Sequence, residues 1–232
     1  MKSPVWLRER ISESTIHNPL PLFLSDIQAF QANIWNLLEI GAWLEGLNYH
    51  SEVTLNIVDF DDTLYGRYIQ LQTNEIQDNR GEAGNALIRE KIGFRNFIEK
   101  YYTRSGAVQR LLWVVEGQTD RHKSLILTAG ISELQEMKID AVKISRQEVP
   151  LITVKTAKDK PKMTIHHIIH SLKFIPGKII IYEDRPECFI EVIQSLRQLF
   201  PRTEIVIDRV SLNPPGMTRQ IKSIKQDIFP VK

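Results

Sequence analysis

Short apolar runs alternate with amphipathic segments along most of the chain. The runs are rich in Ile, Leu and Val, which is typical of buried strands, and they lie at 54–58, 124–127, 141–144, 178–182 and 204–207. Apolar side chains at helical spacing predict helices at 94–113, 132–137, 164–172 and 186–200. Because strands and helices alternate, the pattern predicts an α/β fold with a doubly wound parallel sheet.

The two ends of the chain lie outside this alternating pattern. Residues 24–47 carry apolar side chains at helical spacing and predict an N-terminal helical element. We therefore expect a helical extension at 1–50, a main domain at 51–210 and a C-terminal tail at 211–232 with little regular structure. A polar stretch with two glycines, 74–90, predicts a loop or small insertion, so a small cap is expected at about 66–110.

Composition narrows the class of protein without identifying a function. The chain has 232 residues, 42% hydrophobic and 25% charged, which is typical of a globular protein with a sizeable core. Its single cysteine, Cys188, excludes an intramolecular disulfide. No apolar run approaches the roughly 20 residues of a membrane span, and the N-terminus lacks a signal-peptide pattern. We therefore expect a cytoplasmic protein with no membrane partner.

Positive charge is concentrated in two segments, although the formal net charge is only +2. Residues 138–162 contain seven Lys or Arg against three Asp or Glu, and residues 197–232 have the same balance. Such segments can attract a phosphorylated substrate or nucleic acid. Composition alone favours a simpler interpretation, a solvated basic surface.

Acidic residues directly follow the first predicted strand, in the run Asp59-Phe60-Asp61-Asp62-Thr63. Ligands of doubly wound sheets bind at the carboxyl ends of strands, so residues at this place are candidates for chemistry. Buried carboxylates repel one another unless a cation neutralises them, and oxygen ligands suit Mg²⁺. Residues two apart on an extended segment face the same way, so Asp59 and Asp61 are expected to address one ligand together. The alternative is a turn and capping cluster.

Three further candidates follow later strands. Thr128 ends the second predicted strand, where its hydroxyl could hold a phosphate oxygen or cap a helix. Glu183 and Asp184 end the Ile-rich strand, where they could bind a cation or cap the next helix. A lysine ahead of the 164–172 helix could neutralise nearby carboxylates, or lie in a solvated loop. Four lysines compete for that role: Lys155, Lys158, Lys160 and Lys162.

The order of these signals resembles the four motifs of the haloacid dehalogenase (HAD) superfamily, over roughly residues 54–208. The resemblance implies that Asp59 attacks phosphorus, forming an aspartyl-phosphate, and that Asp61 acts as general acid and base. It implies that Mg²⁺ binds Asp59, Asp61 through its backbone carbonyl, and Asp184, with Glu183 nearby. Phosphoryl or substrate contacts are expected from Thr63, Thr128 and a lysine. Lys160 is favoured as that lysine because Lys160-Pro161 matches the family pattern, and Lys162 is the runner-up.

A narrower resemblance concerns the run Tyr182-Glu183-Asp184-Arg185, which is similar to the Swiss Army Knife RNA-repair-like branch of the superfamily. The chain departs from that branch at Thr128, which is followed by Ala-Gly rather than Gly-Arg. The 69 residues between Asp59 and Thr128 (128 − 59) leave room only for a small cap. In this superfamily a small cap accompanies larger substrates, such as a polynucleotide end, a phosphoprotein or a large phosphorylated metabolite. The competing hypothesis is a nucleic-acid- or protein-binding module on a HAD scaffold without turnover.

Overall fold

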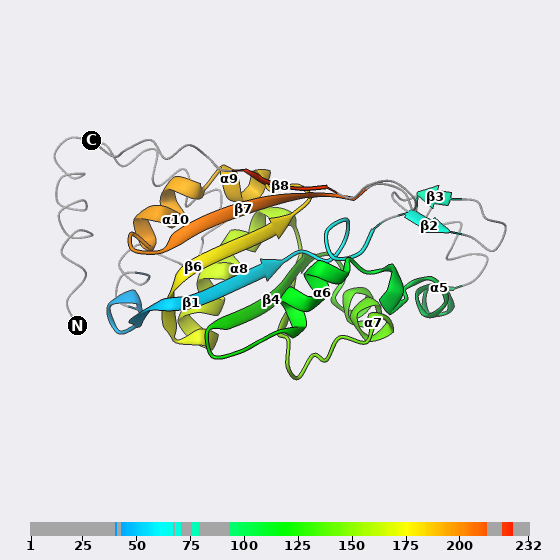
Figure 1. The fold of residues 1–232 in the computed structure, drawn as a ribbon, viewed down its shortest axis with the longest axis horizontal. Helices are drawn as coiled ribbons and strands as arrows, with labels where there is room; N and C mark the ends of the chain where they lie inside the picture. Colours follow the sequence, from blue (N-terminus) through cyan, green and yellow to red (C-terminus); the bar gives the residue numbers. More distant parts are fainter. Residues whose placement is uncertain are drawn as a thin grey trace.

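The protein is built around a six-stranded sheet with the strand order β5-β4-β1-β6-β7-β8 (Figure 1). The computed structural model describes residues 40, 43–66, 68–70, 76–78, 93–212 and 220–224. The strands are β1 (Asn48–Val58), β4 (His122–Ala129), β5 (Leu151–Val154), β6 (Phe174–Glu183), β7 (Glu204–Ser211) and β8 (Gln220–Ile224). The first five pair in parallel and β8 pairs antiparallel with β7. The predicted α/β fold with a parallel sheet is therefore confirmed.

Helices cover both faces of the sheet. On one face the core contains residues of α5 (Phe94–Tyr101), α6 (Gln109–Glu116) and α7 (Ser132–Val142). On the other face it contains residues of α8 (Lys160–His166), the π-helical turn η3 (His167–Leu172), α9 (Glu187–Ile190) and α10 (Ile193–Leu199). Strand residues contribute to both, because successive side chains of a strand alternate between its faces: Ile57 packs on the second face and Val58 on the first.

The strand order reverses between β1 and β6. From β1 the chain proceeds outward to β4 and β5, and it then returns through α8 to β6 on the other side of β1 before continuing to β7. Val58 and Tyr182 are register partners near the carboxyl ends of these two strands. Such a reversal opens a crevice where ligands bind in doubly wound folds. Asp59 and Asp184 therefore begin the loops on either side of this crevice.

Four predicted strands are confirmed inside β1, β4, β6 and β7, but the strand predicted at 141–144 is wrong. Ala141 and Val142 complete α7, and Lys143 ends it in the left-handed conformation with φ 62°. Val142 and Ile144 are both buried across this helix end, which produced the apolar pattern. The strand at this edge of the sheet is β5, and no strand was predicted over its residues.

The predicted helix boundaries also need correction. The helix predicted at 94–113 is interrupted by the 3₁₀ turn η1 (Arg104–Gly106), which separates α5 from α6. The helix predicted at 186–200 is divided into α9 and α10. The helix predicted at 164–172 begins earlier, at Lys160, and the one predicted at 132–137 continues to Val142. The C-terminal tail, expected to have little regular structure, contains the strand β8.

Other sequence expectations fall partly outside the described residues. Of the N-terminal helix predicted at 24–47, only residues 40 and 43–45 are described as helical. In the expected cap the structure describes a short hairpin, β2 (Tyr68–Gln70) and β3 (Ile76–Asp78), beyond the carboxyl ends of the central strands (Figure 1). Within the described part of the chain, no helix has the length and apolar character to span a membrane.

Candidate active site

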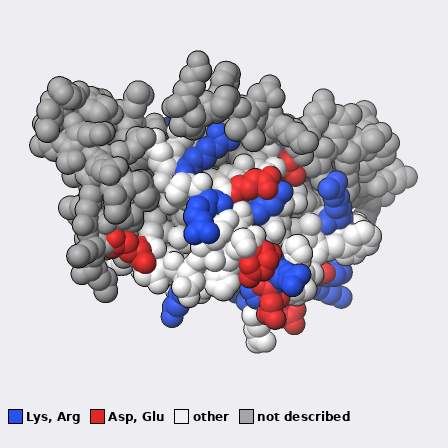
Figure 2. Space-filling view, turned by 60° about the vertical axis from the view of Figure 1, so that its left-hand side comes forward, with Lys and Arg blue, Asp and Glu red and all other residues white. Residues whose placement is uncertain are grey.

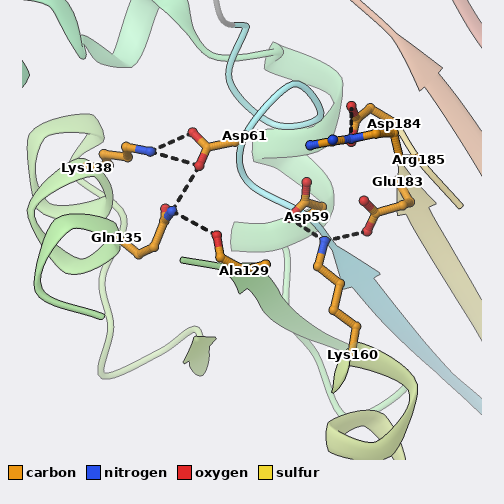
Figure 3. Close-up of polar contacts among 9 residues, drawn as sticks. All are labelled: Asp59, Asp61, Ala129, Gln135, Lys138, Lys160, Glu183, Asp184 and Arg185. Atoms are coloured by element: carbon orange, nitrogen blue, oxygen red, sulfur yellow. Dashed lines mark hydrogen bonds and ion pairs between the residues drawn. The ribbon is translucent and has the colours of Figure 1, made fainter. Parts of the chain in front are cut away.

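A buried ion-pair network joins the two sides of the crevice. The ammonium group of Lys160 lies 2.8 Å from Oδ1 of Asp59 and 2.7 Å from Oε2 of Glu183 (Figure 3). All three side chains are at most 6% exposed. Lys160 reaches the crevice as the first residue of α8, after the capping box that Thr156 and Asp159 form in the 3₁₀ turn η2 (Ala157–Asp159). Three elements distant in sequence thus place the ammonium group of Lys160 between two carboxylates.

A third carboxylate completes an acidic cluster. Oxygens of Asp59, Glu183 and Asp184 lie within 4.8 Å of one another, close enough that one ion could be held among them. If all three carboxyls are ionised, they and Lys160 together carry a net charge of −2 (−3 + 1). Among the described residues, Arg185 also pairs with the cluster: it lies 3.4 Å from Asp184 and is 82% exposed. All-oxygen donors with this excess charge fit a divalent cation such as Mg²⁺. The residues present therefore suit the expected metal.

The pKa values of the buried groups are shifted by burial and by this excess of negative charge. Burial raises the pKa of Asp59 to about 6, against the opposing effect of Lys160. Burial, followed by the charge of Asp59, raises the pKa of Glu183 to about 9. Burial alone would lower the pKa of Lys160, but the two carboxylates outweigh it and raise that pKa, so the ammonium stays charged. One lysine cannot balance two buried carboxylates, and a bound cation would favour their ionised forms.

Two buried hydroxyls near the crevice have no hydrogen-bond partner among the described residues. Thr63 is fully buried in the turn after β1, and Thr128 is 1% exposed near the end of β4. The Oγ1 atoms of both are unpaired. A buried hydroxyl without a partner costs free energy, so such atoms call for an explanation. A ligand oxygen at the ends of these strands would supply the missing acceptor.

The structure does not place the carboxylate of Asp61 beside that of Asp59. Asp61 accepts hydrogen bonds from Lys138 Nζ, at 2.8 Å to each carboxylate oxygen, and from Gln135 Nε2 at 2.9 Å (Figure 3). It is also absent from the acidic cluster. The expectation that Asp59 and Asp61 address one ligand together assumed an extended segment. The turn that begins at Phe60 breaks that alternation, so the two side chains diverge.

Sequence analysis named four lysines as candidates and favoured Lys160, with Lys162 as the runner-up, and the structure brings Lys160 to the carboxylates. Lys160 is 2% exposed and contacts both Asp59 and Glu183. Lys155 and Lys158 are exposed and Lys162 is partly exposed. Among the described residues, none of these three forms an ion pair with the cluster.

Sequence analysis did not identify Gln135 and Lys138 as site residues. They lie three residues apart on α7 and so share one face of the helix. The predicted helix ended at residue 137, which left Lys138 in a segment interpreted only as basic. The available signal was this polar pair at helical spacing, directly after the predicted phosphate-binding strand.

Cys188 lies close enough to the cluster for its charges to act on the thiol. Burial, followed by the charge of Glu183, raises the pKa of Cys188 to about 12. The thiolate is the nucleophilic form of cysteine, and this environment keeps the sulfur protonated. Among the groups around the crevice, Asp59 is therefore the better candidate for a nucleophile.

Comparisons with known proteins add little to this geometry. No family model matches the chain, and no curated protein gives a significant match. Among solved structures, the chain is similar to the HAD domain of the effector protein Lem4 from Legionella pneumophila. The identity is 12%, over 74% of this chain and 90% of that one, and the TM-score is 0.39. This likeness is too distant to support an assignment of function, and the comparisons give no support to the Swiss Army Knife branch.

Proposed function

We propose that this protein is a magnesium-dependent phosphohydrolase of the HAD type, with Asp59 as its nucleophile. The observation that carries the proposal is the arrangement at the crevice. Asp59 is paired with the buried Lys160 and lies beside Glu183 and Asp184 at the ends of adjacent strands. Burying so many charges without a function would be costly, and perturbed carboxylates in a crevice are typical of catalytic sites.

In the proposed reaction, an oxygen of Asp59 forms a bond to phosphorus while the bond from phosphorus to the leaving oxygen breaks. Asp61 gives its proton to that leaving oxygen. It then takes a proton from the water that attacks the aspartyl-phosphate, which releases inorganic phosphate and restores Asp59. The unpaired hydroxyls of Thr63 and Thr128 donate hydrogen bonds to the phosphoryl oxygens.

Asp59, Asp184 and the backbone carbonyl of Asp61 would hold Mg²⁺, whose charge would offset that of the phosphoryl oxygens. Glu183 lies beside these ligands and is tied to Lys160. Lys160 fixes the orientation of Asp59 and stays protonated, so it does not compete with Asp61 for proton transfer.

A large substrate suits the described part of the cap, because the elements between β1 and α6 are short and the hairpin strands have only three residues each. We therefore propose a polynucleotide end, a phosphoprotein or a large phosphorylated metabolite. The basic segments contribute less free charge than the sequence suggests. Lys138, Arg146 and Lys160 of the first segment are all paired with acidic side chains. Basic and acidic side chains are also interspersed on the face in Figure 2.

The decisive experiment is phosphate release from para-nitrophenyl phosphate, phosphopeptides, and 3′- and 5′-phosphorylated oligonucleotides, with Mg²⁺ or EDTA. Turnover should require Mg²⁺ and fall by about a thousandfold or more in Asp59→Asn, as for other enzymes that lose their nucleophile. Asp140→Asn is the matched control, because Asp140 is exposed and paired with Arg146 away from the cluster. Full turnover by Asp59→Asn would overturn the proposal.

Binding of the same oligonucleotides, measured at several salt concentrations, distinguishes the alternative, a nucleic-acid-binding module without turnover. That alternative expects oligonucleotide binding that weakens steeply with salt and is unchanged in Asp59→Asn. Absence of turnover together with such binding would favour it over the enzyme. Absence of binding near physiological salt would count against it.

A further inference from the structure

Two side chains of α7, Gln135 and Lys138, hold the carboxylate of Asp61 from one side. We name this pair the α7 clamp. Lys138 Nζ donates to both oxygens of Asp61 at 2.8 Å, and Gln135 Nε2 donates to Oδ2 at 2.9 Å. Figure 3 shows the carboxylate of Asp61 directed toward α7, while that of Asp59 is directed toward Lys160. Three donor contacts leave the carboxylate little rotational freedom.

The ammonium group of Lys138 is itself held in place. It lies 5.6 Å from the ring centroid of Tyr102, within the range of a cation–π contact. The Tyr102 ring stacks on Tyr65, with centroids 4.7 Å apart, and Tyr65 closes the loop that carries Asp61 through its carbonyl contact to Asp62 N. The Lys138 side chain is 16% exposed. Lys138 is thus connected, through Tyr102 and Tyr65, to the loop whose aspartate it holds.

Gln135 connects the loop after β1 to the end of β4. Its Nε2 contacts Asp61 and also the carbonyl of Ala129, at 3.4 Å. Gly130 has φ 146°, and a Cβ there would lie only 2.9 Å from Gln135 Nε2. A glycine after Ala129 therefore leaves room for the amide. Since Thr128 precedes Ala129, the clamp fixes Asp61 relative to the strand end where the phosphoryl group is expected to bind.

We propose that Gln135 and Lys138 are positioning residues, which hold the Asp61 carboxylate at one place for proton transfer to and from the reacting oxygens. This proposal rests on the proposed function. Stability alone does not explain the pair well, because ion pairs with an exposed partner contribute little to folding, and the Asp61 side chain is 41% exposed. Accurate placement of an acid–base group, by contrast, strongly affects the rate of a reaction.

A double-mutant cycle tests the proposal. Lys138→Met should lower kcat by about tenfold or more with little change in KM, and Lys138→Arg should restore part of the loss. In the Asp61→Asn background, Lys138→Met or Gln135→Met should have less than about a twofold further effect, because the residue they position is already lost. Lys178→Met is the matched control, since it removes an exposed lysine–glutamate pair between β6 and the amino-terminal end of β7, away from the carboxyl ends of the strands.

A second measurement reports on proton transfer directly. Across a series of substituted phenyl phosphates, kcat/KM should depend more steeply on leaving-group basicity in Lys138→Met and in Asp61→Asn than in the wild type. The double variant should be no steeper than Asp61→Asn. Equal losses from Lys138→Met in both backgrounds, or an unchanged leaving-group dependence, would overturn the clamp alone. A wild type without magnesium-dependent turnover would overturn the proposed function and the clamp together.

Discussion

Lys160 Nζ lies 2.8 Å from Oδ1 of Asp59, and the two side chains are only 3% and 6% exposed. The pair joins the start of α8 to the end of β1, across more than 100 residues of sequence. A buried ion pair of this kind gains little over an apolar pair, because both charges are removed from water. In the proposed function, the pair holds the Asp59 carboxylate at a fixed place, so removing the cation should be costly.

Lys160→Met should destabilise the fold severely. The substitution leaves Asp59 and Glu183 buried without their cation, and breaking a buried pair in this way costs about 3–5 kcal/mol. Urea unfolding measures the change in the free energy of unfolding. Adding Asp59→Asn to Lys160→Met removes the ionised carboxylate that has lost its cation and should recover part of the loss. An unchanged unfolding midpoint in Lys160→Met would contradict the buried network.

Activity should depend on pH through Asp59. Burial raises the pKa of Asp59 to about 6, and only the ionised carboxylate attacks phosphorus. At limiting Mg²⁺, turnover should therefore fall as the pH drops through about 6. Saturating Mg²⁺ favours the ionised form and should move this acid limb to lower pH. The measurement is kcat/KM against pH at two Mg²⁺ concentrations, and identical acid limbs would contradict it.

Sequence patterns predicted the strands of the site better than its polar contacts. The Ile-rich run at 178–182 and the run before Asp59 could be identified because central parallel strands are buried on both faces and are therefore mostly apolar toward their carboxyl ends. Glu183 and Asp184 then follow from the rule that functional groups lie at carboxyl strand ends. The site residues at the ends of β1 and β6 were thus predictable from local sequence.

The remaining contacts depended on tertiary structure. Which lysine reaches Asp59 is decided by the point at which α8 begins. The residue pattern alone left four lysines within eight residues open, and Lys160 was favoured only through the family resemblance of Lys160-Pro161. The contact of Lys138 with Asp61 required α7 to continue beyond residue 137, but the predicted helix ended there and the apolar end of α7 was mistaken for a strand. Helix ends are the least predictable feature of a sequence when, as at Lys143, no glycine marks the left-handed position.

Mg²⁺ should stabilise the protein more at high pH than at low pH. The pKa of Glu183 is raised to about 9 in the folded state, against 4.5 in its ordinary environment. The folded state therefore binds more protons than the unfolded state between these values, and stability without metal falls as the pH rises through this window. A cation that favours the ionised cluster opposes that loss. The increase in Tm on adding Mg²⁺ should thus be larger near the upper end of the window than near its lower end.

Two variants check that the Mg²⁺ effect comes from the cluster. Asp184→Asn removes a charged oxygen ligand and should reduce the Mg²⁺-dependent increase in Tm. Asp140→Asn removes a charge of the same kind on the outer surface of α7 and should leave the increase unchanged. Equal increases in both variants would place the stabilising ion elsewhere.

Thr128→Val should separate activity from stability. The Thr128 hydroxyl is buried without a partner in the described structure, so replacing it with a methyl group should stabilise the fold by about 1 kcal/mol or leave it unchanged. The same change removes a proposed donor to the phosphoryl group and should lower kcat/KM by about a hundredfold. Thr203→Val is the matched control. Thr203 is also buried, but its hydroxyl donates to the carbonyl of Pro176 at 2.8 Å, far from the carboxyl ends of the strands.

Thr203→Val should therefore show the opposite pattern. It loses a satisfied hydrogen bond and should cost about 1 kcal/mol of stability with no change in kcat/KM. Thermal unfolding and steady-state kinetics on both variants give the comparison. If Thr128→Val instead destabilised the fold and left the kinetics intact, its hydroxyl would have a structural partner, and the phosphoryl group would have to be held by other donors. Buried hydroxyls without partners are retained at a cost in stability, and a cost carried at the end of a central strand is best explained by the ligand that relieves it.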